Sequence, residues 1–320
     1  MYDYTFAMLT YNQEKFVIEH LESLRYQIEK FGQKYHIFFL LCDDCSTDKT
    51  VMFVKNWIAQ NSYLFMECQY IISEKNRGIV RNYVQCLQNI KTDNFKILAG
   101  DDLYYKNNIF EITRNRDFVL SPLIHIPSIN IEEKFFWTYK YAVIRKKNLR
   151  RDFEEFIKYI HVIQTPGVFW KHKYFDKKMV EMLKGYKWIE DTPTWNYLLS
   201  NDSLNVYFEE KPLIMYRESA GISTNENHAL YSEFRKEQIK IKEQIFVNNK
   251  KVRILNPYRY KYFCMRIIYE RWMPYFSKKY RNYAKYLNIE KREASIYYNK
   301  IKSNASNWLS GFVESESITH

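Results

Sequence analysis

The chain of 320 residues lacks several features that mark other classes of protein. No stretch approaches the roughly 20 consecutive apolar residues that cross a bilayer. The first residues run directly into an apolar, strand-like segment, without a basic leader or a cleavage site. There is also no internal repeat and no low-complexity linker. With 46% hydrophobic residues, this composition predicts a globular protein of the cytoplasm.

Cysteine is scarce and scattered. The five cysteines are odd in number and do not form the regular pattern of a disulfide framework, so we expect free thiols in a reducing compartment. Cys42 and Cys45 form a CxxC pair, but no second Cys or His pair lies at the spacing of a zinc site. We therefore interpret these cysteines as structural.

The excess of positive charge lies at the end of the chain. The net charge is +12; residues 229–320 carry 19 Lys and Arg against 8 Asp and Glu, whereas residues 1–228 carry 30 against 29. The end region also has 11 tyrosines and two tryptophans. This composition favours contact with an anionic membrane surface or a helical layer packed on the rest of the protein. Stacking on single-stranded nucleic acid is less consistent with the remainder, so we expect no nucleic-acid partner.

Apolar segments alternate with helical spacing in the first hundred residues, which predicts βαβ units and an α/β fold with a mostly parallel sheet. Four segments are expected as strands: Thr5–Thr10, Ile37–Leu41, Tyr70–Ile72 and Phe95–Leu98. We expect Asn12 to cap the first helix and Ser46 or Thr47 the second, with a third helix over residues 78–89. Further along, strands are expected at 136–144 and 204–208.

Three acidic pairs stand at the ends of these elements. Asp43 and Asp44 follow the second strand, Asp101 and Asp102 follow the fourth, and a third pair precedes a helix expected over Thr192–Leu199. Adjacent carboxylates repel each other, so such a pair usually binds a cation. Because ligands bind at the carboxyl ends of parallel strands, the pairs are interpreted as parts of one active site.

A turn after the third strand carries Asn76, Arg77 and Gly78, followed by Arg81. The glycine permits a close approach of the backbone, and the cations can meet phosphate oxygens. The same kind of turn also occurs in proteins that bind no ligand, so by itself it is weak evidence for a phosphate-binding site.

The ordered set of segments resembles the family 2 glycosyltransferases with the GT-A fold, over residues 5 to about 223. The blocks that carry the resemblance are FAMLTYN (6–12), DDCSTDKT (43–50), NRGIVRN (76–82), LAGDD (98–102) and IEDTPTW (189–195). The resemblance implies a Rossmann-like, mostly parallel central sheet with helices on both faces, followed by a helical C-terminal region. It implies an inverting transfer of a sugar from a nucleoside diphosphate, with UDP expected, to a hydroxyl of a glycan in surface polysaccharide or glycoconjugate synthesis.

The resemblance also implies roles for single residues. Those expected to bind the nucleotide or donor are Thr10, Tyr11, Asn12, Asp43, Asp44, Asn76, Gly78, Arg81, Asp101, Glu190 and Arg217. Asp102 and Asp101 match a motif that holds Mn²⁺ or Mg²⁺, and Asp191 matches the catalytic base. Many members carry a third aspartate where this chain has Ala99, so Asp102 is the first choice as direct metal ligand.

The resemblance divides the chain and names its partners. Residues 1–228 are expected to form the catalytic domain, with a nucleotide-sugar half at 1–117 and an acceptor half at 118–228, and residues 229–320 a basic helical region broken at Pro257 and Pro274. The acceptor is expected to be a glycan or a glycan linked to polyprenyl diphosphate, and the basic region to contact the inner face of the plasma membrane. The sequence also leaves open whether the protein forms a homo-oligomer.

Two departures from the family pattern keep alternatives open. A late block at 216–223 lacks the histidine that members often carry in its middle, and Ala99 replaces an aspartate. A nucleotide-sugar or glycan-binding protein with weak catalysis is therefore one alternative. A metal-dependent nucleotidyltransferase is the other, although it has no evident use for Asp191.

Overall fold

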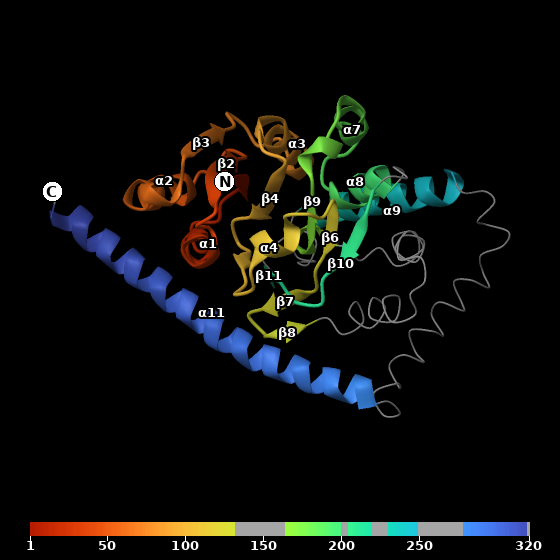
Figure 1. Ribbon diagram of the computed structural model, residues 1–320. Coiled ribbons are helices and arrows are strands. Elements are labelled where there is room, and N and C mark those ends of the chain that lie inside the picture. Colours follow the sequence, from red (N-terminus) through yellow and green to blue (C-terminus); the bar gives the residue numbers. More distant parts are fainter. Residues whose placement is uncertain (132–163, 200–203, 219–229, 249–277, 319–320) are drawn as a thin grey trace.

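The computed structural model describes residues 1–131, 164–199, 204–218, 230–248 and 278–318 (Figure 1). Its strands are β1 Tyr2–Thr10, β2 Tyr35–Asp43, β3 Glu67–Ile72, β4 Asn94–Ala99, β5 Leu103–Tyr104, β6 Phe118–Leu120, β7 Leu123–Ile126, β8 Asn130–Ile131, β9 Val168–Trp170, β10 Val206–Phe208 and β11 Ile214–Arg217. Its α-helices are α1 Val17–Phe31, α2 Thr50–Gln60, α3 Ile79–Asn89, α4 Ile109–Thr113, α7 Lys177–Leu183, α8 Asp191–Leu199, α9 Tyr231–Asn248 and α11 Lys278–Ile318. Short 3₁₀ turns lie at Ser62–Leu64, Thr165–Gly167 and His172–Tyr174.

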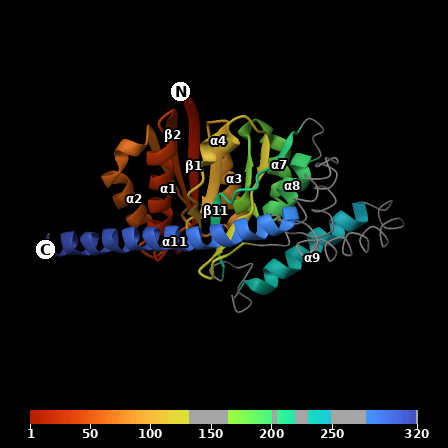
Figure 2. The ribbon, with the colours of Figure 1, turned by 60° about the horizontal axis from the view of Figure 1, so that its bottom comes forward.

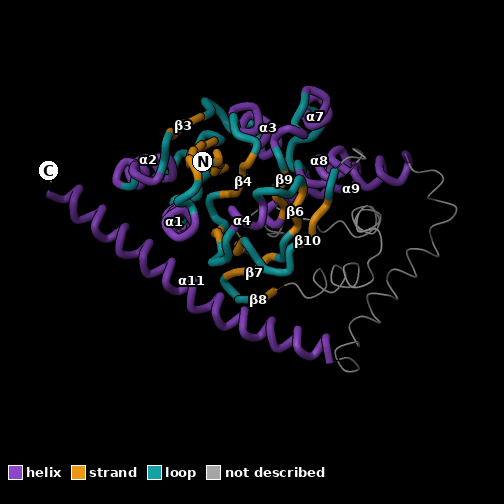
Figure 3. The backbone as a smooth tube through the Cα atoms, in the orientation of Figure 1, coloured by secondary structure: helices purple, strands orange, loops and turns teal. Residues whose placement is uncertain are grey.

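The central sheet has the strand order β3-β2-β1-β4, and all its pairings are parallel. This confirms the predicted α/β fold and the four predicted strands, each within a few residues of its expected bounds. Two smaller sheets, β10-β6-β9 and β5-β11-β7-β8, lie beyond β4 (Figure 3). The segment 136–144, expected as a strand, and both prolines of the end region lie outside the described residues.

Helices cover both faces of the central sheet, because successive side chains of a strand point to opposite faces. Along β1, Tyr4, Phe6 and Met8 belong to the core beneath α1 and α2, whereas Ala7 belongs to the core beneath α3 and α7. The inner face of α1 carries apolar residues at helical spacing: Val17, Ile18, Leu21, Leu24 and Ile28. The resemblance's expectation of helices on both faces is confirmed.

The starts of the first two helices differ from the predicted caps. α1 begins at Val17, and Asn12 lies in a turn with φ +51°, where its side-chain oxygen accepts a hydrogen bond from Thr47 N (2.8 Å). α2 begins at Thr50, while Ser46 Oγ accepts a hydrogen bond from Asn12 N (2.8 Å). The predicted caps were wrong, because these side chains bond across to the neighbouring loop instead of to the helix that follows.

The long helix α11 lies along the body of the protein, from α1 past β8 (Figures 1 and 2). Its inner face packs Leu287, Ala294, Tyr297 and Ile301 against the region of β7, β8 and β11. Further on, Ala305 joins the core beneath α1 and α2. Within the part of the chain that the structure describes, no helix combines the length and apolarity that a membrane span requires.

Candidate active site

The strands of the central sheet deliver polar residues to one edge. Thr10, the last residue of β1, lies opposite Asp43, the last residue of β2. On the other side of β1, Leu9 lies opposite Ala99, the last residue of β4. The loops that carry the predicted nucleotide and metal residues therefore begin side by side, at the edge where parallel sheets bind ligands.

Asp43 shapes the loops that follow β1 and β2. Its carboxylate is fully buried and accepts hydrogen bonds from Thr10 Oγ1 (2.6 Å) and Ser46 N (2.7 Å). Next to it, Tyr11 leaves 47% of its surface exposed, and Asn12 bonds to the neighbouring loop as described above. Asp43 thus has a role in the fold of the site, and its contact with a nucleotide, like those of Thr10, Tyr11 and Asn12, stays a prediction.

Asp44 joins the end of β2 to the turn after β3. Its two carboxylate oxygens accept hydrogen bonds from the backbone N–H groups of Arg77 and Gly78, both at 2.8 Å. Gly78 has φ +89°, and its N–H also bonds to Asn76 Oδ1 at 3.1 Å. Burial raises the pKa of Asp44 in spite of the two backbone hydrogen bonds. Arg81 is exposed on the first turn of α3, and its contact with the nucleotide stays a prediction.

The second acidic pair is tied to β11. Asp102 Oδ1 accepts a hydrogen bond from Arg217 N, and Arg217 Nε donates to the carbonyl oxygen of Asp101, both at 2.9 Å. The other guanidinium nitrogens of Arg217 bond to Glu19 Oε2 (2.5 Å) and to Tyr298 Oη on α11 (3.1 Å). The predicted contact of Arg217 with phosphate would require it to exchange these partners.

Asp101 and Asp102 have the properties of a hard-cation site. Burial, and then the charge of Asp101, raise the pKa of Asp102 well above its ordinary value, and burial raises the pKa of Asp101. Within the described ranges no third His, Cys, Asp or Glu joins them to form a cluster. Mg²⁺ is commonly bound through one or two carboxylates, with water and substrate phosphates supplying the other ligands. The two residues therefore fit a divalent cation that is shared with a diphosphate.

The third acidic pair lies at the start of α8. Thr192 donates hydrogen bonds to Asp191 Oδ1 through both its backbone N–H and its hydroxyl, the latter at 3.1 Å. Thr165 Oγ1 donates to Glu190 Oε1 at 3.0 Å. Burial raises the pKa of Asp191, and burial together with the neighbouring Asp191 charge raises the pKa of Glu190 to about 7. An acid with such a pKa suits proton transfer near neutral pH; the role of Asp191 as the base stays a prediction.

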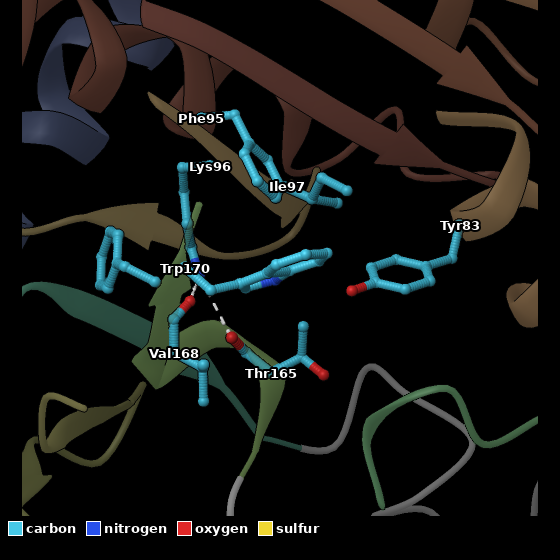
Figure 4. A pocket seen from close by; sticks show the side chains of 8 residues that line it. Tyr83, Phe95, Lys96, Ile97, Thr165, Val168 and Trp170 are labelled. Atoms are coloured by element: carbon cyan, nitrogen blue, oxygen red, sulfur yellow. Dashed lines mark hydrogen bonds between the residues drawn. The ribbon is translucent and has the colours of Figure 1, made fainter. Parts of the chain in front are cut away.

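A buried lysine holds the segment that contacts this acidic pair. Lys96 lies in β4 and is only 2% exposed; its Nζ donates to the carbonyl oxygens of Thr165 (3.1 Å), Pro166 (2.8 Å) and Val168 (2.8 Å). Figure 4 shows Lys96 reaching this segment at a small pocket, with the hydroxyl of Tyr83 on the opposite side. Burial lowers the pKa of Lys96 to about 7. Lys96 thus fixes the segment whose threonine bonds to Glu190.

The turn at Asn76 to Gly78 and the start of α3 also contact the segment that leads to Glu190. Val80 N donates to the carbonyl oxygen of Lys187 at 3.2 Å. A Cβ atom on Gly78 would lie 3.1 Å from that same oxygen. The absence of a side chain at Gly78 therefore lets the turn that carries Asp44 lie directly against the approach to the acidic pair of α8.

Sequence reasoning missed several polar residues that support the site: Glu19, His20, Lys96, Thr165 and Glu237. His20 Nδ1 donates to the carbonyl oxygen of Asp102 at 2.8 Å, and burial lowers the pKa of the imidazole to about 4. For His20 and Lys96, the signal in the sequence was a polar residue in a position where burial is expected. Lys96, for example, stands inside an apolar strand, and His20 lies on the inner face of α1.

The parallel sheet with acidic residues at its carboxyl edge is a GT-A-type α/β fold. The chain belongs to glycosyltransferase family 2: the family model, described as Glycosyl transferase family 2, matches residues 5–172, just over half of the chain. This match confirms the resemblance drawn from the sequence motifs.

Solved structures give distant matches. Residues 1–349 of TarS from S. aureus, in complex with UDP-GlcNAc, align with a TM-score of 0.51 and 14% identity over 75% of this chain and 65% of that chain. A longer S. aureus TarS structure gives 0.49 and 16% identity over 68% of this chain and 37% of that chain. The mannosyltransferase PcManGT from Pyrobaculum calidifontis, in complex with GDP-Man and Mn²⁺, gives 0.48 and 12% identity over 99% of this chain and 79% of that chain.

The chain thus spans less than two thirds of the length of the TarS structures that it matches. A search of curated protein sequences finds no match. At these identities the TarS likeness shows the fold and leaves the donor and acceptor undefined.

Proposed function

We propose that this protein is a metal-dependent, inverting glycosyltransferase that moves a sugar from a nucleoside diphosphate to a hydroxyl of a glycan or lipid-linked glycan. The observation that carries the proposal is the placement of the three acidic pairs. Two of them follow β2 and β4, the strands on either side of β1, and Asp44 is linked through the Gly78 turn to the segment before the third pair. Family membership supports the same class of reaction.

In the proposed reaction, each group has a distinct task. Asp44 and the loops after β1 and β2 bind the nucleotide, with the exposed ring of Tyr11 stacked on the base. Asp191 accepts the proton of the acceptor hydroxyl as its oxygen attacks the anomeric carbon from the face opposite the leaving group. Such base catalysis typically contributes about 10² to 10⁴ in rate.

Asp101 and Asp102 are proposed to hold Mg²⁺ or Mn²⁺. When bound there, the cation stabilises the negative charge of the departing nucleoside diphosphate. Asp102 is the proposed direct ligand, because Ala99 stands where many members of the family carry a further aspartate and has no side-chain oxygen. The backbone N–H of Arg217 holds one of its oxygens in place.

We propose that residues 1–228 form the catalytic domain and that the basic region contacts an anionic membrane surface. Exposed residues at helical spacing on α11 support this contact: Lys285, Ile289, Arg292, Ile296 and Lys300. The variant with both isoleucines changed to serine should bind anionic vesicles more weakly than the wild type. Equal co-sedimentation of the two proteins would contradict a membrane role for this face.

The nucleotide product of the reaction tests the proposed function. The full chain is incubated with a panel of nucleotide sugars, beginning with UDP-GlcNAc, and with Mg²⁺ or Mn²⁺. We expect release of free nucleoside diphosphate, and loss of that release in Asp191→Asn with nucleotide affinity retained. Release of pyrophosphate or nucleoside monophosphate would instead support a nucleotidyltransferase, and no release with retained binding would support a binding protein. Normal turnover of Asp191→Asn would refute the assigned base.

A further inference from the structure

Helix α9 places one acidic residue on an otherwise apolar face. Leu230, directly before the helix, and Phe234 and Ile241 within it pack against Trp188 and Ile189. The spacing of these residues is that of one helical face. Glu237 lies on the same face, between Phe234 and Ile241, where the packing pattern leads one to expect a further apolar side chain.

Glu237 binds the backbone that leads into the acidic pair of α8. Its Oε2 accepts a hydrogen bond from Lys187 N, and its Oε1 accepts from Trp188 N and Ile189 N, each at 2.8 Å. Three consecutive N–H groups therefore converge on one carboxylate. Hydrogen bonds to an ionised acceptor are stronger than neutral ones, so this side chain defines the path of the segment up to Ile189.

The opposite side of the same segment is held by the start of α3, directly after the Gly78 turn. The carbonyl oxygen of Lys187 accepts the hydrogen bond from Val80 N, in the turn where Gly78 N donates to Asp44. Residues 187–189 are thus fixed from α9 on one side and from α3 on the other. Glu190 follows directly, and a catalytic group that follows a rigid segment keeps its position.

We propose that Glu237 is a positioning residue of the active site, which holds residues 187–189 so that Glu190 and Asp191 face the acceptor in the reactive geometry. This inference rests on the proposed function. It extends the active site to a helix that lies beyond the matched family segment of residues 5–172. The catalytic domain would accordingly depend on part of the region after residue 228.

The negative charge of Glu237 also affects the pKa of Glu190, which a purely structural role of Glu237 would not do. The groups that face Glu190 are Asp191 in the same segment, Thr165 from the turn before β9, Tyr83 from α3 and Glu237 from α9. The negative charge of Glu237 contributes to the raised pKa of Glu190. Replacement of Glu237 by a neutral residue should therefore lower the pKa of the acidic pair.

The experiment compares Glu237→Ala and Glu237→Gln with Glu233→Gln in the full chain. Glu233 is one turn earlier on α9 and forms an exposed ion pair with Lys187 Nζ (3.7 Å), without a hydrogen bond to the backbone of the described residues, so its variant controls for loss of an acidic residue on this helix. Glu237→Gln keeps one carbonyl oxygen as an acceptor, which guards against a fold defect in the alanine variant. Hydrogen exchange of peptides that cover 186–191 and sugar transfer are measured for each protein.

We expect faster exchange of the amides of residues 187–189 in Glu237→Ala, and kcat lower by about 10 to 10²-fold, since small misplacements of catalytic groups can cost 10²-fold. In Glu237→Gln the acid limb of the kcat–pH profile should move to lower pH. Glu233→Gln should match the wild type in both measurements.

Unchanged exchange at residues 187–189 in Glu237→Ala would overturn the inference, and so would transfer within twofold of the wild type. A wild-type protein that turns over no nucleotide sugar would refute the proposed function instead. In that case the exchange measurement still decides whether Glu237 fixes the segment.

Discussion

Replacement of Gly78 by alanine should disturb both the stability and the chemistry of this protein. Gly78 has φ +89° and ψ 163°, a region of backbone conformation that is almost confined to glycine and costs other residues about 1–3 kcal/mol. The new Cβ would lie 3.1 Å from the carbonyl oxygen of Lys187 and 3.2 Å from its Cγ. It would thus push on the acceptor of the Val80 N hydrogen bond, which is worth about 1 kcal/mol.

The sum of these effects is a loss of about 2–4 kcal/mol in the free energy of unfolding for Gly78→Ala. Gly311→Ala is the matched control, because Gly311 lies in α11 and a Cβ there would meet nothing within 4 Å. Alanine is about 1 kcal/mol better than glycine inside a helix, so this variant should be slightly more stable than the wild type. The two Gly→Ala changes should therefore have opposite signs.

The assay is equilibrium unfolding in urea, where a change in midpoint at a constant m-value reports stability. Sugar transfer is measured in parallel, and we expect Gly78→Ala to lose about 10²-fold in kcat because the displaced segment leads into Glu190 and Asp191. A midpoint of Gly78→Ala equal to that of the wild type would refute the strain at this turn. Normal transfer at reduced stability would refute its connection to the acidic pair.

Three further predictions concern charge. Asp102→Asn should weaken nucleotide binding in the presence of Mg²⁺ or Mn²⁺ and leave binding in EDTA unchanged; equal affinities of variant and wild type with the metal would contradict its role as a ligand. Because burial raises the pKa of Asp191, the assigned base, kcat should fall on acidification already above the pH at which an ordinary aspartate is protonated. Glu190→Gln should move that limb to lower pH, since Asp191 loses a negative neighbour; an unmoved limb would exclude the pair as its origin. Arg217→Met leaves Glu19 without its buried partner and should cost about 3–5 kcal/mol in urea unfolding, whereas a loss below about 1 kcal/mol would show that Glu19 finds another partner.

The order of the elements of the central sheet was readable from the sequence. The unbroken apolar run in β2 indicates a buried parallel strand, because only a strand covered on both faces is apolar throughout. The run in β4 indicates the same, although Lys96 interrupts it. Acidic residues directly after such strands can only lie at the carboxyl edge of the sheet. The pair at Asp43 and Asp44 and the motif from Leu98 to Asp102 follow this rule, which is local in character.

The tertiary structure decided which groups hold those acids in place. Asn12 and Ser46 are residue types that commonly cap helices. In this protein they form a hydrogen bond with each other, between two loops that are more than 30 residues apart in the sequence. Arg217 was expected at phosphate, and its guanidinium lies between Glu19 and Tyr298, which come from opposite ends of the chain. Spacing along one segment carries no information about such pairs, since each depends on how α1, β11 and α11 pack together.

Gly78 and Glu237 show the same division. A glycine in a polar turn is predictable from its sequence, because only the backbone conformation of the turn is required. That its missing side chain makes room for Lys187, and that Glu237 on α9 accepts hydrogen bonds from the N–H groups of residues 187–189, follows from how distant elements pack around one short segment. The parallel sheet and its acidic edge follow from the sequence alone, because the apolar pattern of a strand and the position after it are local properties. The way in which that edge is joined to α8, α9 and α11 depends on packing, because those joints are hydrogen bonds between distant segments.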